Sequence, residues 1–339
     1  MKCDLFLLGE AVHRDAAAAP GDLLTYATVA ERAGFDAVWL AEHHFIRYGG
    51  CPSPPVMAAA ILTATTRLRV GTAACILSNR HPVGLAEEAV MLDGISQGRF
   101  HLGVARGGPW VDLEVFGTGR DRFDAGFSEA LDLLCEWLHG ERVSADGRFF
   151  SFRQVPVWAR PTDRLGVWVA ATSMSTVDVA ARRGLPLLLG VHATDGEKAA
   201  LVERWRDVAQ RHGHDPDAAE HGAVYLAFAA DDHAQGASRL RSPMRRWLAT
   251  GVGDYQRLDG TRGSSDQAGY VDRLIDTHLV GEPEESAERL VASMRRTGVE
   301  RALLMVEGAD SLTEVTENIA RLGAELLPNV NARPTRVHR

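Results

Sequence analysis

The chain has 339 residues, 45% hydrophobic and 24% charged, which is ordinary usage for a globular protein. Its net charge of -8 argues against a nucleic-acid groove or an anionic membrane surface, since both require concentrated positive charge. The four cysteines are scattered, and no signal-peptide pattern is present. No stretch approaches the ~20 apolar residues of a membrane span. We therefore expect a reduced, cytoplasmic protein.

Strand-like and helix-like segments alternate along the chain. We expect strands at residues 2–8, 37–41, 68–76, 100–105, 167–171, 185–189, 223–229 and 301–306. Helical patterns lie at residues 22–33, 53–65, 82–95, 127–138, 175–182, 196–212, 232–250 and 311–326. Eight alternating units predict a parallel (β/α)8 TIM barrel in one domain, residues 1–330, with a polar tail at residues 331–339.

Two segments fall outside this alternation. Residues 140–161 have the pattern of a small hairpin, with Asp146-Gly147 as its turn. Residues 251–283 are rich in Gly, Asp, Ser and Thr and have no sustained periodicity. A polar insertion of this length before the last strand is either an active-site lid or a disordered surface loop.

Titratable side chains follow the second strand, where Glu42, His43 and His44 succeed an apolar run. The carboxyl ends of parallel strands are where barrel enzymes carry their chemistry, although such residues can also simply hydrogen-bond in a polar loop. Alternation along a strand would place His43 and His44 on opposite sides. A metal-dependent hydrolase built on His43, His44, His81, His101 or His192 is therefore disfavoured, and we expect no metal.

A phosphate site is indicated by two neighbouring strand ends. Arg106 precedes Gly107-Gly108 after the fourth strand, and residues 172–176 form a hydroxyl-rich helix start after the fifth. Guanidinium groups and free helix N-termini both bind anions, although Ser175 and Asp178 also fit a plain helix cap. The chain has no Rossmann fingerprint, P-loop or nucleophile elbow.

Six segments, in the same order over nearly the whole chain, resemble the landmarks of the bacterial luciferase-like, flavin-dependent monooxygenases. They are AGFDAVWLAEHHF, VGTAACILSNRHP, LDGISQGRFHLGVARG, AATSMST, RRGLPLLL and VGEPEE. The resemblance implies a TIM barrel that takes reduced FMN from a separate flavin reductase. With dioxygen the flavin forms a peroxyflavin, which oxygenates an organic substrate.

The resemblance also implies roles for particular residues. His43 matches the active-site histidine, and Glu42 beside it is assigned to the cofactor site. Ala73-Ala74 matches a non-prolyl cis peptide under the flavin ring. Arg106, Ser173 and Thr176 match the phosphate-binding residues.

The chain also departs from the light-emitting enzymes. Ala105 stands where they often have Cys, and Thr172 replaces a Glu. These departures do not support a long-chain aldehyde substrate or light emission. A deazaflavin-dependent hydride-transfer enzyme on the same fold, or a non-catalytic flavin-binding relative, remains an alternative.

Further expectations concern the substrate and assembly. A largely apolar pocket is expected, and the apolar candidates for its wall are Met57, Trp110, Phe116, Met174 and Val191. Residues 53–65 are rich in small side chains, and the resemblance places the subunit interface on this helix and the next. We therefore expect a homodimer.

Overall fold

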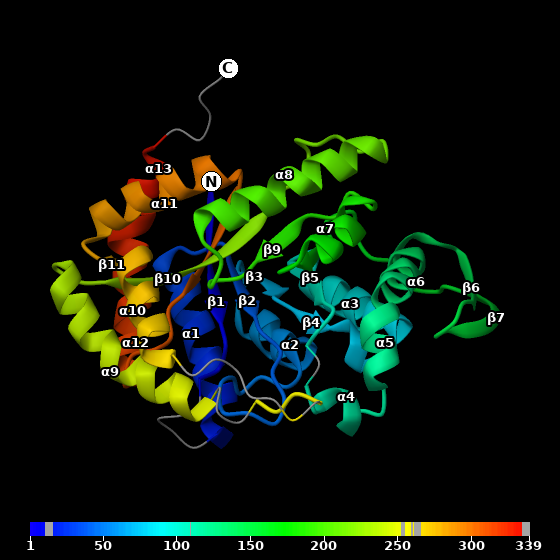
Figure 1. The fold of residues 1–339 in the computed structure, drawn as a ribbon, viewed down its shortest axis with the longest axis horizontal. Coiled ribbons are helices and arrows are strands. Elements are labelled where there is room, and N and C mark those ends of the chain that lie inside the picture. The colour runs from blue at the N-terminus through cyan, green and yellow to red at the C-terminus, as the bar shows by residue number, and fades with distance from the viewer. Residues whose placement is uncertain (11–15, 109, 252–254, 259, 261–265, 334–339) are drawn as a thin grey trace.

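The computed structural model describes residues 1–10, 16–108, 110–251, 255–258, 260 and 266–333. Eight strands surround a common axis (Figure 1). They are β1 (Lys2–Leu7), β2 (Ala37–Leu40), β3 (Arg69–Thr72), β5 (Phe100–Ala105), β8 (Val167–Ala170), β9 (Leu187–Leu189), β10 (Gly222–Ala229) and β12 (Arg301–Met305).

The eight strands form a closed parallel barrel. Each pairs in parallel with the next in chain order, and β12 returns to pair with β1. The register of the closing pair runs from Lys2 opposite Arg301 to Phe6 opposite Met305. The TIM barrel predicted from the alternating pattern is therefore confirmed.

Helices surround the barrel, and the eight predicted ones are present with ends shifted by a few residues (Figure 1). The helices are α1 (Ala19–Ala33), α2 (Pro54–Ala64), α3 (Pro82–Ser96), α4 (Asp112–Val115), α5 (Gly119–Ala125), α6 (Phe127–His139), α7 (Met174–Ala181), α8 (Asp195–Arg211), α9 (His233–Gly251), α10 (Gln267–Thr277), α11 (Pro283–Thr297), α12 (Leu312–Arg321) and α13 (Leu327–Asn331). Gly34 and Gly298 end α1 and α11 in the left-handed conformation, which glycine adopts without steric cost.

Three predicted segments differ in detail. The strand predicted at residues 68–76 is divided into β3 and β4 (Cys75–Ile76), because the chain bends at Ala73-Ala74. The hairpin consists of β6 (Arg142–Asp146) and β7 (Ser151–Pro156), joined by four residues rather than by a two-residue Asp-Gly turn. Residues 334–339, most of the predicted tail, lie outside the described residues.

The segment at residues 251–283 contains more regular structure than its composition indicates. It contributes α10 and β11 (Leu279–Gly281), and β11 extends the sheet beside β10. β9 pairs with β10 only at Gly222 and Ala223, whereas β11 pairs with residues 227–229. The prediction of an irregular insertion was wrong here, because an edge of β10 offers hydrogen bonds that local composition does not reveal.

Trp39 forms the floor of the barrel interior. Its indole N–H donates to Asp4 at 2.9 Å, and its ring stacks on His101 with centroids 5.9 Å apart. Asp4 also pairs with Arg301, whose guanidinium lies over the indole. A Cβ at Gly71 would lie 2.3 Å from the Trp39 ring, so glycine is needed beside this floor. These contacts fill the amino end of the barrel interior with aromatic and charged side chains.

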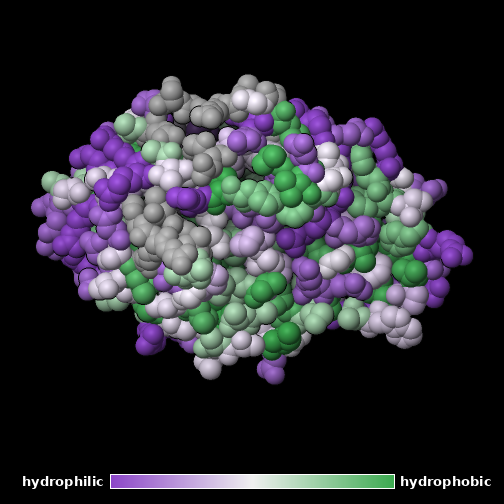
Figure 2. Space-filling model, turned by 90° about the horizontal axis from the view of Figure 1, so that it is seen from below, coloured by the Kyte–Doolittle hydropathy of each residue, from purple (hydrophilic) through white to green (hydrophobic). Residues whose placement is uncertain are grey.

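Figure 2 views the molecule from the side on which α4 lies in Figure 1. Hydrophilic and hydrophobic residues are mixed on this face, and a group of hydrophobic residues gathers in its lower middle. Among the described residues, no helix is both long and apolar enough to span a membrane.

Candidate active site

A cavity of about 490 Å³ lies at the carboxyl ends of the strands. This volume is within the range of small-molecule sites. Of the seven predicted site residues, six line it: Glu42, His43, Ala73, Ala74, Arg106 and Thr176. Ser173 is not part of the wall but caps α7 and bonds to the Thr176 hydroxyl at 3.1 Å. The barrel thus gathers into one cavity residues that are more than 130 positions apart in sequence.

His43 presents a neutral imidazole to the cavity. Burial lowers its pKa to about 4, and the neighbouring His44 adds to the shift. Its Nδ1 atom is buried and has no hydrogen-bond partner among the described residues. The ring packs edge-on against Tyr48, with centroids 5.0 Å apart. A Cβ at Gly49 would lie 2.5 Å from Nδ1, so the glycine makes room for the ring.

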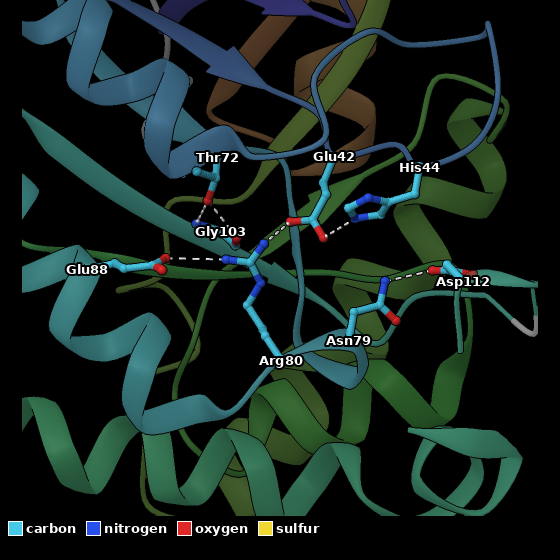
Figure 3. Close-up of polar contacts among 8 residues, drawn as sticks. All are labelled: Glu42, His44, Thr72, Asn79, Arg80, Glu88, Gly103 and Asp112. Carbon is cyan, nitrogen blue, oxygen red and sulfur yellow. Dashed lines mark hydrogen bonds and ion pairs between the residues drawn. The ribbon is translucent and has the colours of Figure 1, made fainter. Parts of the chain in front are cut away.

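Glu42 is held from two sides (Figure 3). Its Oε1 lies 2.9 Å from His44 Nε2, and its Oε2 accepts from Arg80 Nη2 at 3.0 Å. Arg80 also reaches the more exposed Glu88 at 3.3 Å. Both carboxylate oxygens of Glu42 are therefore engaged with protein groups. We interpret Glu42 as a residue that positions His44 within the cavity wall.

The expected separation of the two histidines was wrong. His43 and His44 both line the cavity. β2 ends at Leu40, so the two-residue alternation of a strand no longer governs residues 42–44. His44 also packs edge-on against Phe116, with centroids 4.9 Å apart.

One wall of the cavity is built from small residues. The Ala73-Ala74 peptide is cis, at the position that the resemblance indicates, and both residues line the cavity. Ala105 and Ala171 add two further small side chains. Beneath this wall the Thr72 hydroxyl exchanges hydrogen bonds with Gly103, at 2.7 and 2.9 Å (Figure 3). The result is a smooth surface suited to a flat ring.

Arg106 supplies a positive charge at the cavity wall. Its guanidinium lies over the Phe123 ring at 4.5 Å, and no carboxylate in the described part of the chain pairs with it. The N-terminus of α7, with Thr176 in its first turn, borders the same cavity. A free guanidinium beside a helix N-terminus and hydroxyl groups is a suitable environment for a phosphate.

The sequence profile of the luciferase-like monooxygenases matches residues 1–301. The chain belongs to this family. Among its relatives, the alkanal monooxygenase alpha chain of Photorhabdus luminescens is 30% identical over 326 residues, covering 90% of this chain and 91% of the relative. The alpha chain from the Kryptophanaron alfredi symbiont is 29% identical, with the same coverage.

Solved structures of luciferase-like folds superpose on this barrel over almost its full length. A monooxygenase from Streptomyces bottropensis has a TM-score of 0.84 at 24% identity, covering 97% of this chain and 99% of that one. The oxygenating constituent of 3,6-diketocamphane monooxygenase from Pseudomonas putida, in complex with FMN, has a TM-score of 0.76 at 20% identity, covering 97% and 98%. An F420-dependent secondary alcohol dehydrogenase has a TM-score of 0.74 at 17% identity, covering 97% and 98%. These similarities establish the fold.

Aromatic residues complete the wall of this luciferase-like cavity. Of the five predicted wall residues, Trp110 and Val191 line it. Met57 is instead buried in the core, and Phe116 and Met174, which do not line the cavity, are 43% and 47% exposed. Tyr48 and Tyr255 line the cavity but were not predicted. They belong to loops, where no periodic pattern indicates the direction of a side chain.

The metal alternative receives no support. Among the described residues, no group of three His, Cys, Asp or Glu side chains is arranged to hold a metal ion. His101 lies on the barrel floor against Trp39, away from His43. His192 does line the cavity, at the wall beside Val191.

Proposed function

We propose that the chain is a flavin-dependent monooxygenase that uses reduced FMN and dioxygen to oxygenate a largely apolar organic substrate. The observation that carries the proposal is the arrangement within one cavity of three features. They are Arg106, which has no carboxylate partner among the described residues, a wall of alanine side chains, and a neutral His43. Membership of the luciferase-like family supports a monooxygenase reaction. The similarity in fold to the diketocamphane monooxygenase constituent, which was solved with FMN, supports FMN as the cofactor.

The donor set fits FMN. Arg106, Thr176 and the capped start of α7 would hold the phosphate, with Ser173 fixing the Thr176 hydroxyl. Ala73 and Ala74 would lie against the ring. Reduced FMN bound here would supply the two electrons for reaction with dioxygen, with one oxygen atom passing to the substrate and the other leaving as water.

His43 would hold and relay a proton at the imidazole nitrogen that faces the cavity. A pKa near 4 keeps the ring neutral at physiological pH, so one nitrogen accepts while the other carries hydrogen. Proton transfer by a positioned side chain contributes ~10²–10⁴-fold to rate. Glu42 would contribute indirectly to proton transfer by His43, because its hydrogen bond holds the neighbouring His44 in place.

Tyr255 and Gln256 would cover the cavity as part of a lid. Tyr255 packs on Trp110 with ring centroids 4.3 Å apart, and Gln256 O accepts from the Val111 N–H at 3.1 Å. Residues 252–254, 259 and 261–265 lie outside the described residues. Tyr255→Ala should increase the hydrogen peroxide released per oxygen consumed, because water enters an uncovered site more readily. Unchanged coupling in this variant would show that the segment is not a lid.

Reduced FMN would come from a separate flavin reductase. The chain has no dinucleotide fingerprint, so the purified protein with FMN should not oxidise NADH or NADPH. Adding a flavin reductase should start oxygen consumption that depends on this protein. Rapid nicotinamide oxidation by the protein and FMN alone would contradict the two-component arrangement.

The second candidate is hydride transfer from a reduced deazaflavin. It is supported by the similarity in fold to the F420-dependent alcohol dehydrogenase. Equilibrium binding separates the candidates. The proposal expects reduced FMN to bind at least tenfold more tightly than reduced F420, and the reverse order would favour hydride transfer.

We also propose a homodimer formed by α2 and α3. Val56 on α2 is 71% exposed, and Met91 on α3 is 64% exposed. Ile95, one helical turn after Met91, is also exposed. Large apolar side chains gathered on adjacent helices are typical of a subunit interface. Sedimentation should show a dimer at micromolar concentration, and Met91→Glu should dissociate it. Trp158→Glu, at an exposed site outside these helices, is the control, and a monomeric wild type would refute the proposal.

A further inference from the structure

A second cavity, of about 390 Å³, is lined mainly by residues of α8, α10 and α11. These helices belong to the layer outside the barrel (Figure 1). It shares Val191 and His192 with the candidate active site but is otherwise lined by different residues. Four of these carry basic side chains: Lys198, Arg273, Arg289 and Arg296. Asp195 is the only carboxylate among the described residues that line it.

Lys198 forms the inner, buried part of this cationic wall. Only 1% of the residue is exposed, and its Nζ lies over the Tyr225 ring, 4.1 Å from the centroid. No carboxylate oxygen in the described part of the chain lies within ion-pair distance of Nζ. Burial of an ammonium that lacks a direct ion pair is costly, and it lowers the pKa of Lys198 to about 8, although the charge of Asp195 acts in the opposite direction from beyond ion-pair distance. The group is therefore suited to an anion that enters from the cavity.

Asp195, the carboxylate that lines the same cavity, does not form an ion pair with Lys198. Asp195 accepts from the Ser293 hydroxyl at 2.6 Å and pairs with Arg296. Arg273 and Arg289 are exposed, and no carboxylate in the described part of the chain pairs with them. The cavity therefore combines a buried ammonium with guanidinium groups near solvent, an arrangement that attracts and retains anions.

The choice of lysine at this position stands out in the sequence. Lys2 and Lys198 are the only two lysines among 37 lysines and arginines. Lys2 is partly exposed and pairs with Glu220 at 2.7 Å. Lysine is a compact point charge, whereas the planar guanidinium of arginine needs a wider space for its five donors. At a buried position that faces a cavity, a lysine therefore presents a single compact charge.

We propose that this flank cavity is a second ligand site, separate from the flavin cavity, that binds a small organic oxyanion at Lys198 Nζ. The oxyanion is a carboxylate or a phosphate monoester, and the guanidinium of Arg273 stabilises its outer end. The cavity volume leaves room for an organic body as well as the charged group. The site does not depend on the proposed monooxygenase activity, so it can be tested without flavin.

The first experiment labels amines in the intact, flavin-free protein. Formaldehyde and cyanoborohydride methylate neutral amines, and mass spectrometry distinguishes Lys198 from Lys2 and the N-terminus. Succinate and inorganic phosphate are the two probes, each added at 20 mM at pH 8. We expect one of them to slow methylation of Lys198 at least tenfold while Lys2 is unchanged. Equal rates at Lys198 with and without both anions would overturn the proposal.

The second experiment measures anion affinity by calorimetry. Lys198→Met removes the charge and keeps the length, so it should weaken binding of the effective probe at least tenfold. Replacing a buried charge by an apolar side chain is often tolerated by a fold. Arg273→Gln changes only an exposed side chain and should weaken binding about threefold or more. Arg142→Gln, at an exposed site on the hairpin, is the matched control and should leave affinity unchanged. Equal affinity in all four proteins would refute the site.

Discussion

His44 Nε2 lies 2.9 Å from Glu42 Oε1, and this contact connects a histidine of the cavity wall to the ion pair between Glu42 and Arg80. The second oxygen of Glu42 pairs with Arg80, and both partners are largely buried. Removing one charge from a buried set leaves the others without compensation. The ion pair between Glu42 and Arg80 should therefore contribute to the free energy of unfolding, which can be measured without an activity assay.

Glu42→Gln should lower the free energy of unfolding by about 1–3 kcal/mol, the usual cost of leaving a buried polar group unsatisfied. Urea unfolding without flavin measures it. Glu88→Gln is the control, since Glu88 pairs with the same Arg80 from a site that is half exposed, and such a pair contributes only ~0–1 kcal/mol. Equal losses in the two variants would contradict the structural role of Glu42.

Arg106→Ala tests the phosphate site. Loss of a charge-assisted hydrogen bond of ~1.5–3 kcal/mol should weaken reduced-FMN binding roughly 10- to 100-fold. Turnover at saturating flavin should change much less. Arg120→Ala is the matched control, because Arg120 lies over the same Phe123 ring but is exposed and pairs with Asp124. Unchanged flavin affinity in Arg106→Ala would remove Arg106 from the site.

His43→Ala should have the opposite effect. Flavin should still bind, while oxygenation should fall by ~10²–10⁴. His139→Ala, on the exposed surface of α6, is the control. His44 is not a suitable control, because it lines the same cavity. A His43 variant that loses flavin affinity but not turnover would reverse the assigned role.

Acid should destabilise the fold through buried histidines. Burial lowers the pKa of His43 and His278 to about 4, and of His101 and His221 to about 3. Their unfolded pKa is ~6.5, so the unfolded chain binds these protons first. The stability that they contribute is complete above pH ~6.5 and is lost as the pH falls towards 4, by up to ~1.4 kcal/mol per pH unit for each group.

Glu307 opposes this trend. Burial raises its pKa to about 7, so the folded state gains protons first as the pH falls. Burial also raises the pKa of Asp4, so four histidines oppose two carboxyl groups, and urea unfolding should show decreasing stability from pH 7 to pH 5. His101→Phe removes two buried nitrogens that have no partner among the described residues, and it should reduce this slope. His139→Phe should not. A flat profile from pH 7 to pH 5 would contradict the assignment.

The sequence predicted the barrel well because buried strands and capped helices carry strong local patterns. The helix predicted at residues 22–33 is present as α1 and ends at Ala33, before the left-handed Gly34. Loop residues were predicted less well. Phe116 and Met174 were expected in the cavity wall but lie outside it and are nearly half exposed, whereas Tyr255 reaches the cavity from a segment without periodicity. Side-chain directions in loops follow from tertiary contacts, which no local pattern encodes.

The role of His44 was missed for a related reason. Strand alternation placed it on the opposite side from His43, but the strand ends at Leu40. Arg80 also gave no signal, since it occupies the turn before α3, where an arginine is normally a surface residue. Its pairing with Glu42 depends on the approach of two loops that are 38 residues apart in sequence.

The most direct test mixes anaerobically reduced FMN, bound to the protein, with aerated buffer and follows the absorbance of oxidised FMN. Free reduced FMN measured under the same conditions provides the reference. The proposed monooxygenase should delay the return of this absorbance at least tenfold, and His43→Ala should shorten the delay while flavin remains bound. Reoxidation of bound flavin at the rate of free flavin would contradict the assignment of this cavity to oxygen activation.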